Sequence, residues 1–117
     1  MDNIKKFKRS FFKDKRGNKP VKEWLMSLPL DHKKTVCNDI VTISFWDINK
    51  SNKEQIARYV AKNLWQVYNP LLKTHFFFTV YKENIILIDG FIASQKQNKI
   101  IIKHFNKAKR RLKEFWR

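Results

Sequence analysis

KTHFFFTVYKENIILIDGF, residues 73–91, contains two strongly apolar segments joined by a short polar turn, and this stretch decides the fold. Extended residues alternate between two faces. One face of the first segment carries His75, Phe77, Thr79 and Tyr81, and the other carries Phe76, Phe78 and Val80. Residues 82–84 suit a tight connection, and residues 84–92 are the antiparallel partner. Because both faces are mostly apolar, we predict a central hairpin that is covered on two sides, by helices on at least one.

The N-terminal part of the chain predicts a strand, a turn and a short helix. Residues 5–12 have the mixed alternation of a strand, and the turn that follows contains Gly17 and Asn18 as candidates for positive φ. Pro20 suits a first helical turn, and apolar residues then recur at helical spacing. We therefore expect a helix over 20–28, which ends before the next proline because the residue preceding a proline avoids the α region.

A second helix, a loop and another strand are expected before the hairpin. Asp31 is a candidate cap for the helix, which should end between 46 and 49. The inner face of this helix carries Val36, Ile40 and Ile43 or Ser44. The polar residues 47–55 predict a loop. Residues 56–68 predict a strand, or a helix-to-strand passage, that ends in a strand over 64–68.

A last helix is predicted over 99–115, because its apolar residues recur every three or four positions. This inward stripe consists of Ile101, Phe105, Ala108, Leu112 and Phe115. We expect an RNA-binding surface on this helix from Lys99, Lys103, Lys107, Arg110 and Arg111. The order of the elements predicts one α+β domain over 1–117, with two N-terminal helices and a C-terminal helix packed on a small antiparallel sheet.

The charge of the chain points to a polyanionic partner. There are 26 Lys and Arg against 10 Asp and Glu, a formal net charge of +16. Such a field concentrates polyanions, so nucleic acid is the first candidate partner, an acidic protein the second and an anionic membrane surface the third. We expect the surplus charge to be concentrated on one side of the sheet.

The cysteine and histidine content limits the chemistry. Cys37 is alone, so no internal disulfide is possible, and a reducing compartment such as the cytoplasm fits. It lies in an apolar helical pattern and is expected to be a small core residue. No Cys/His cluster has metal-ligand spacing, and no signal peptide or membrane span is recognised. We therefore expect no metal, no cofactor and no membrane.

Four phrases stand in order along the chain: KDKRGNKPVKEWLMSLP (13–29), NLWQVY (63–68), IILIDGF (85–91) and KAKRRLKEF (107–115). In this order and spacing they resemble the RelE/ParE superfamily of toxins from bacterial toxin-antitoxin modules. Within the superfamily they are most similar to the HigB-like, phage-related branch. The resemblance covers nearly the whole chain.

The resemblance implies a type II toxin, an endoribonuclease that cleaves messenger RNA on the ribosome without a metal. In that reaction the RNA 2′-OH attacks its own phosphodiester. The site must therefore supply a group that takes the 2′ proton, cations beside the phosphate and a donor to the 5′ oxygen. The resemblance also implies a cognate antitoxin, a small helix-turn-helix protein, as a partner.

The resemblance implies an active site on the face of the sheet, where the cations left near the rim are Lys73, His75 and Lys96. We therefore expect a catalytic set of His75, Lys73, Tyr68 and Lys96. His75 is expected to transfer the proton, since an imidazole with an ordinary pKa of about 6.5 suits both halves of the reaction. Lys73 and Lys96 are expected to neutralise the phosphate. Tyr68 is expected to donate a proton or to stack on a base.

The chain also departs from the family pattern. Tyr68 and Asp89 stand where the family has an arginine and a histidine, and Ala93 and Ser94 stand where it has lysines. An aspartate at this place is expected to repel an RNA phosphate. His104, on the last helix, is expected to be structural or at the surface. Two alternatives therefore stay open: a non-catalytic basic protein that binds RNA, the ribosome or an antitoxin, and a ParE-like inhibitor of DNA gyrase.

Overall fold

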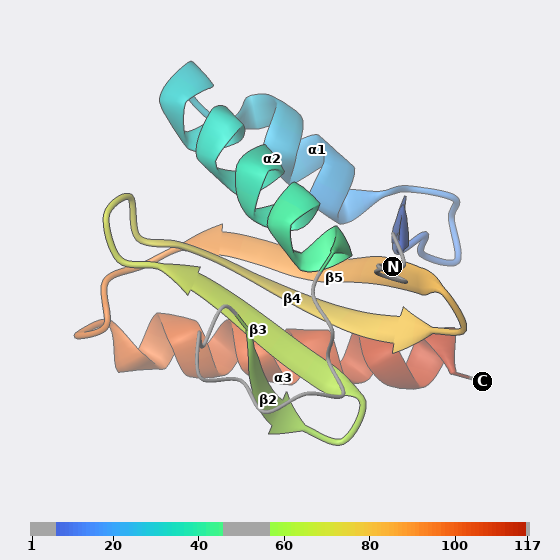
Figure 1. Ribbon diagram of the computed structural model, residues 1–117. Helices are drawn as coiled ribbons and strands as arrows, with labels where there is room; N and C mark the ends of the chain where they lie inside the picture. Colours follow the sequence, from blue (N-terminus) through green and yellow to red (C-terminus); the bar gives the residue numbers. More distant parts are fainter. Residues whose placement is uncertain (1–6, 46–56, 117) are drawn as a thin grey trace.

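The protein is built around a five-stranded sheet with helices on both faces (Figure 1). The computed structural model describes residues 7–45 and 57–116. The elements, in chain order, are β1 Lys8–Phe11, α1 Pro20–Ser27, α2 Leu30–Ser44, β2 Arg58–Ala61, β3 Leu64–Asn69, β4 Thr74–Tyr81, β5 Asn84–Ile92 and α3 Asn98–Phe115. Helices α1 and α2 cover one face and α3 crosses the other. The predicted α+β class, with this placement of helices, is confirmed.

The strand order is β1-β5-β4-β3-β2, which places the predicted hairpin inside the sheet. Strands β2 to β5 pair antiparallel in succession, as the sequence predicts. The edge strand β1 instead runs parallel to β5, from Lys8 opposite Asn84 to Phe11 opposite Leu87. The sheet is therefore mixed rather than wholly antiparallel, because β1 pairs with a strand to which no turn connects it.

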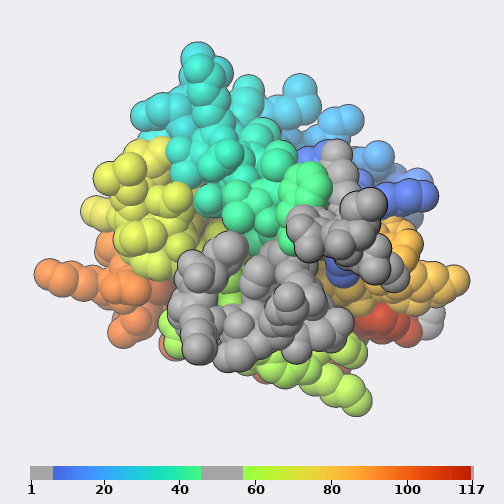
Figure 2. Space-filling view, in the orientation of Figure 1, coloured from blue at the N-terminus to red at the C-terminus, as the bar shows by residue number. Residues whose placement is uncertain are grey.

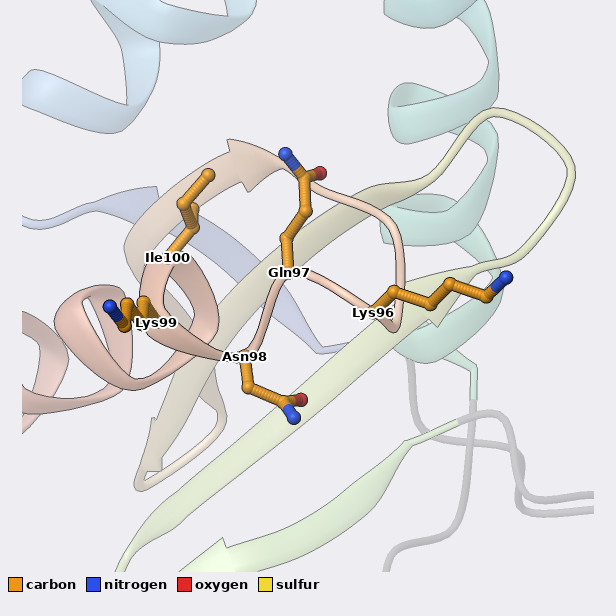
Figure 3. A pocket seen from close by; sticks show the side chains of 5 residues that line it. All are labelled: Lys96, Gln97, Asn98, Lys99 and Ile100. Carbon is orange, nitrogen blue, oxygen red and sulfur yellow. The ribbon is translucent and has the colours of Figure 1, made fainter.

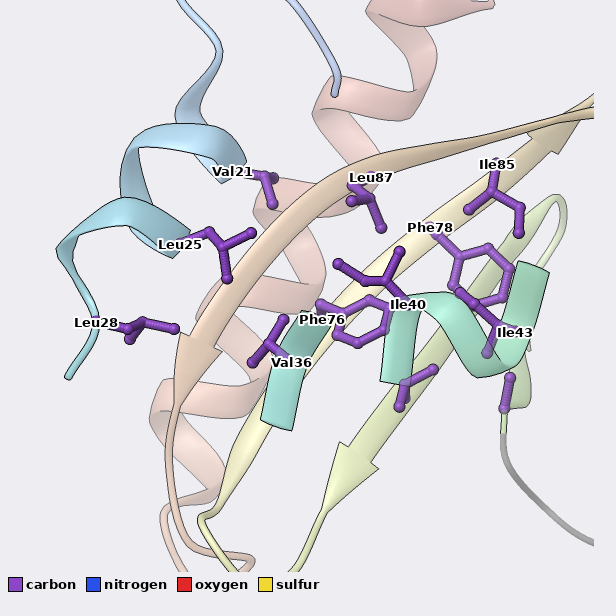
Figure 4. Packing of buried hydrophobic residues seen from close by; sticks show 12 residues of the cluster. Val21, Leu25, Leu28, Val36, Ile40, Ile43, Phe76, Phe78, Ile85 and Leu87 are labelled. Atoms are coloured by element: carbon purple, nitrogen blue, oxygen red, sulfur yellow. The ribbon is translucent and has the colours of Figure 1, made fainter. Parts of the chain in front are cut away.

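The hairpin of β4 and β5 separates two apolar cores. Figure 4 shows the core beneath α1 and α2, which consists mainly of Val21, Leu25, Leu28, Val36, Ile40, Ile43, Phe76, Phe78, Ile85 and Leu87. The core beneath α3 consists mainly of Phe12, Leu64, Phe77, Ile86, Ile88, Phe91, Ala93, Ala108 and Leu112. Burial of each large apolar side chain contributes roughly 1.5–3 kcal/mol to stability. Because both cores include side chains of β4 and β5, the packing of both helical layers depends on this hairpin. The predicted alternation of β4 and the inward stripe of α3 are confirmed.

A β-bulge interrupts the pairing of the hairpin. Phe78 lies opposite Leu87, but the preceding residue Phe77 lies opposite Asp89, so Ile88 is an extra residue in β5. Ile88 packs in the α3 core, and Asp89 binds side chains of α3. Two consecutive residues of β5 therefore face α3, which a regular strand does not allow.

The next residue of β5, Gly90, packs against α1. A Cβ atom built at Gly90 would collide with the indole ring of Trp24. Glycine is therefore required here to let the strand approach the helix closely. Trp24 is partly buried and packs on the core beneath α1 and α2.

Several local predictions differ from the structure. Helix α2 starts at Leu30 with Pro29 at the N-cap position, so Asp31 lies in the first turn and does not cap it. The helix ends at Ser44, earlier than predicted. The predicted loop at 47–55 lies outside the described residues.

Cys37 is exposed rather than in the core. Its neighbour Val36 lies on the buried stripe of α2, and one position along a helix turns the side chain by about 100°. In the turn between β1 and α1, Gly17 has a positive φ of 88°, whereas Asn18 does not adopt a positive φ. Within the described part of the chain, no helix is long and apolar enough to cross a membrane.

Gly90→Ala is expected to lower the free energy of unfolding by roughly 3 kcal/mol, because the new methyl group would overpack the contact with Trp24. Urea denaturation measures this change. Adding Trp24→Leu to Gly90→Ala should recover part of the loss. Gly17→Ala is the control, because it meets no atom within 4 Å and should cost only about 1 kcal/mol for its positive φ. Equal losses for the two alanine variants would contradict the packing explanation.

Candidate functional site

Four aromatic rings stack in a row on the α3 side of the sheet, one each from β3, β4, β5 and α3. They belong to Tyr68, His75, Phe91 and His104, and adjacent ring centroids lie 4.4, 4.4 and 4.2 Å apart. The row follows the strand pairing, because Tyr68 lies opposite His75 and His75 lies opposite Phe91. The rings of His75, Phe91 and His104 are nearly parallel, whereas Tyr68 is tilted by 31° against His75, and these contacts fix the orientation of the rings.

His75 lies inside this row and is buried. Its Nε2 donates to the backbone oxygen of Ala93 at 2.8 Å, so Nδ1 is the acceptor for the side-chain amide of Gln66 at 3.0 Å. Burial lowers the pKa of His75, and the hydrogen bond to Ala93 only partly opposes this effect. Both ring nitrogens are thus occupied in a neutral ring. The role of His75 as the base stays a prediction, while the structure places it as a support of the row.

Asp89, in β5, is hydrogen-bonded to two side chains of α3, one of which is His104 at the end of the row. One carboxylate oxygen accepts from Nδ1 of His104 at 2.7 Å, and the other accepts from Nη1 of Arg111 at 2.9 Å. The same Nη1 also donates to the backbone oxygen of Ile88 at 2.9 Å. The expected repulsion between Asp89 and a phosphate is therefore offset, because the carboxylate is buried and paired with a guanidinium.

The Asp89 cluster, defined as Asp89, His104 and Arg111, has groups suited to acid–base chemistry on an anion. Nδ1 of His104 donates to Asp89, so in the neutral ring Nε2 is the acceptor, and it has no hydrogen bond within the described residues. Within the part of the chain that the structure describes, Arg111 uses only Nη1 in its hydrogen bonds, so Nη2 and Nε are donors for a ligand. Both side chains are partly exposed. The cluster thus combines a proton acceptor with a fixed cation.

Lys73 and Lys96 flank one end of the sheet. Lys73 is exposed in the turn between β3 and β4, with a φ of 61°. Its backbone oxygen accepts from the backbone N–H of Ala93 at 3.0 Å, so this turn lies against the end of β5. Figure 2 shows the turn in yellow beside the orange segment that leads into α3. Of the four residues predicted to be catalytic, the structure brings Tyr68 and His75 into contact. Lys73 is close to them in the chain, but its side chain and that of Lys96 are exposed.

A shallow hollow lies at the start of α3 and is lined by Lys96, Gln97, Asn98, Lys99 and Ile100 (Figure 3). The lysine side chains point to opposite sides of it. The side-chain oxygen of Gln97 accepts from the backbone N–H of Ser94 at 2.8 Å and closes the turn. Diverging side chains do not aim their charges at one phosphate. The phosphate contacts of Lys96 and Lys99 therefore stay predictions.

Helix α3 has a high density of cations. Lys99, Lys103 and Arg110 are exposed, whereas Lys107 and Arg111 are partly buried. Exposed lysines also occur on the other side of the sheet, at Lys22 of α1 and Lys34 of α2. Helix α3 nevertheless carries seven Lys and Arg against one Glu, whereas α1 and α2 together carry three Lys against three acidic residues. Among the helices the surplus charge therefore lies on the α3 side, and its concentration over the whole molecule stays a prediction.

The place of His104 in a functional cluster was not predicted from the sequence. A usable signal was present, since His104 and Arg111 are seven positions apart and so lie on the same flank of a helix. The position of Asp89 had no such signal, because the bulge at Ile88 turns its side chain toward α3. In the described part of the chain, no group of three or more His, Cys, Asp or Glu is placed to hold a metal ion.

The free energy of unfolding is expected to decrease as the pH falls below about 6.5, the ordinary pKa of histidine. Below that pH the unfolded chain takes up a proton at residue 75, whereas the buried imidazole of the folded protein does not. The folded-state pKa of His75 is lowered, so this stability is present above the unfolded pKa and is lost as pH falls. Urea denaturation between pH 7 and pH 5 measures the slope. His75→Gln should make this slope smaller. His32→Gln, which replaces a histidine of α2, is the control and should leave the slope unchanged. An equal slope in wild type and His75→Gln would contradict this assignment.

Comparison with known proteins supports the fold. No protein-family model matches the chain, and no curated protein matches it in sequence. Among solved structures, the chain is similar to the isolated E. coli RelE toxin in its P21 crystal form, with a TM-score of 0.53 and 14% sequence identity. The match covers 83% of this chain and 97% of the RelE chain. The chain therefore has the fold of the RelE toxin.

Proposed function

We propose that this protein is the toxin of a type II toxin-antitoxin module and that it cleaves messenger RNA on the ribosome. The observation that carries the proposal is the Asp89 cluster, in which His104 offers a proton acceptor beside the guanidinium of Arg111. The RelE-like fold and the net charge of +16 support it. The HigB-like branch, the cytoplasmic location and a small helix-turn-helix antitoxin belong to the same proposal.

In the proposed reaction, Nε2 of His104 takes the proton of an RNA 2′-OH. The 2′ oxygen bonds to phosphorus as the bond to the 5′ oxygen breaks, and the 5′ oxygen takes a proton from solvent. Asp89 holds the imidazole in the required tautomer, and Arg111 stabilises the charge that develops on the phosphate oxygens. The reaction requires no metal.

The four residues predicted to be catalytic from the sequence have other roles in this proposal. Tyr68 lies three ring spacings of 4.2–4.4 Å from His104, too far to act on the same phosphate. It is suited to hold a neighbouring base by stacking. Lys73 and Lys96 are exposed and are proposed to contact phosphates farther along the RNA. His75 lies within the row of rings, between Tyr68 and Phe91, and holds it in place.

Inducible expression in a bacterium, followed by primer extension on total RNA, tests the function. We expect growth to stop and new 5′ ends to form. His104→Gln keeps a donor for Asp89 but removes the base, and it should lower cleavage by about 100-fold or more. His32→Gln is the matched histidine control and should cleave like wild type. Thermal melting of the purified variants checks that each is folded.

Other outcomes would contradict parts of the proposal. Cleavage that His75→Ala abolishes and His104→Gln spares would return the role of base to His75. Growth arrest with intact RNA and induced DNA damage would favour inhibition of gyrase. No arrest would favour a non-catalytic RNA-binding protein, an alternative that the buried state of His75 supports.

A further inference from the structure

Three aromatic rings meet where β4 ends and α3 ends, at the opposite end of β4 from His75. Tyr81 contacts Phe115 edge to face at 5.9 Å and Trp116 at 5.2 Å between ring centroids. Phe115 and Trp116 are themselves 5.5 Å apart. The ammonium group of Lys82 lies 5.4 Å from the centre of the Tyr81 ring. The Asp89 cluster does not include these residues.

Two of these rings are open to solvent although they pack on each other. Tyr81 is 40% exposed and Trp116 is 41% exposed, whereas Phe115 belongs to the α3 core. Closing the last turn of α3 requires only the ring of Phe115, which is partly buried against the α3 core. The exposed faces of Tyr81 and Trp116 are therefore in excess of what the core needs.

Aromatic and basic residues alternate along the flank of α3 that leads to Trp116. Phe105, Lys109 and Trp116 are four and seven positions apart, so they lie on one flank. The ammonium group of Lys109 lies 4.8 Å from the centre of the Phe105 ring. The acidic residue of α3, Glu114, is turned about 160° away from Trp116 around the helix axis.

The outer surface of the helix connects Trp116 with the Asp89 cluster. Arg111 is on the other flank of α3, roughly 7–8 Å back along the axis from Trp116. The helical period places Lys113 and Arg110 between the two flanks on the outer surface, and both are exposed. A strand that passes over the last turns of α3 would thus meet Lys113 and Arg110, and then Glu114, which the helical period places between Arg110 and Arg111.

We propose that Tyr81 and Trp116 form a stacking site for bases of single-stranded RNA, with Lys82 and Lys109 beside its phosphates. This inference rests on the proposed function, since it concerns how the same RNA is held. Flat exposed rings interleaved with cations are the usual means of binding single strands without sequence preference. The net charge of +16 favours a polyanion over a protein at this surface.

The probe is a short fluorescein-labelled oligouridine in which every 2′-OH is methylated, so that binding is measured without cleavage. Trp116→Leu should weaken binding about tenfold, equivalent to roughly 1.4 kcal/mol, because one stacked base is lost. Trp116→Phe should retain most of the affinity, and Tyr81→Leu should repeat the loss. Tyr59→Leu is the control, since Tyr59 is an aromatic residue of the edge strand β2 that is 60% exposed.

The salt dependence separates stacking from charge. Trp116→Leu should leave the slope of log affinity against log salt unchanged, whereas Lys82→Gln and Lys109→Gln should each reduce it by about one. Affinity that neither Trp116→Leu nor Tyr81→Leu changes would overturn the inference and point to a protein partner on these rings. If that result came with normal cleavage by wild type, only this inference would fail. A wild-type protein that binds no oligouridine but still produces new 5′ ends on induction would overturn only this inference, because the proposed cleavage takes place on the ribosome.

Discussion

The burial of β4 and β5 on both faces is the constraint on which the structure depends. A strand pair with one polar face needs one covering layer, but this hairpin has apolar side chains on both sides. Two layers are therefore required, and the chain supplies α1 and α2 before the hairpin and α3 after it. The positions of the helices follow from the hairpin rather than from contacts among themselves.

Within that arrangement, the bulge at Ile88 creates the candidate site. An uninterrupted β5 would turn Asp89 away from α3 and Gly90 toward it. With the extra residue, Asp89 reaches His104 and Arg111, while Gly90 faces Trp24 on the opposite side. One inserted residue thus sets both the polar contact with α3 and the close packing of α1.

Much of the fold was predictable, because burial on both faces leaves a clear record in the sequence. Phe76, Phe77 and Phe78 alternate between the two cores as an extended strand requires. The site was less predictable, since His75 carries the residue type of a base but lies beneath the surface with both nitrogens bonded. Side-chain exposure and bulges depend on contacts between distant segments, and single-sequence periodicity does not record such contacts.

Asp89 has two carboxylate oxygens, and a different partner occupies each of them. His104 and Arg111 therefore share one anchor, although neither contacts the other through a hydrogen bond in the described residues. Whatever shifts the carboxylate toward one partner draws it from the other, so substitutions at these positions are energetically coupled.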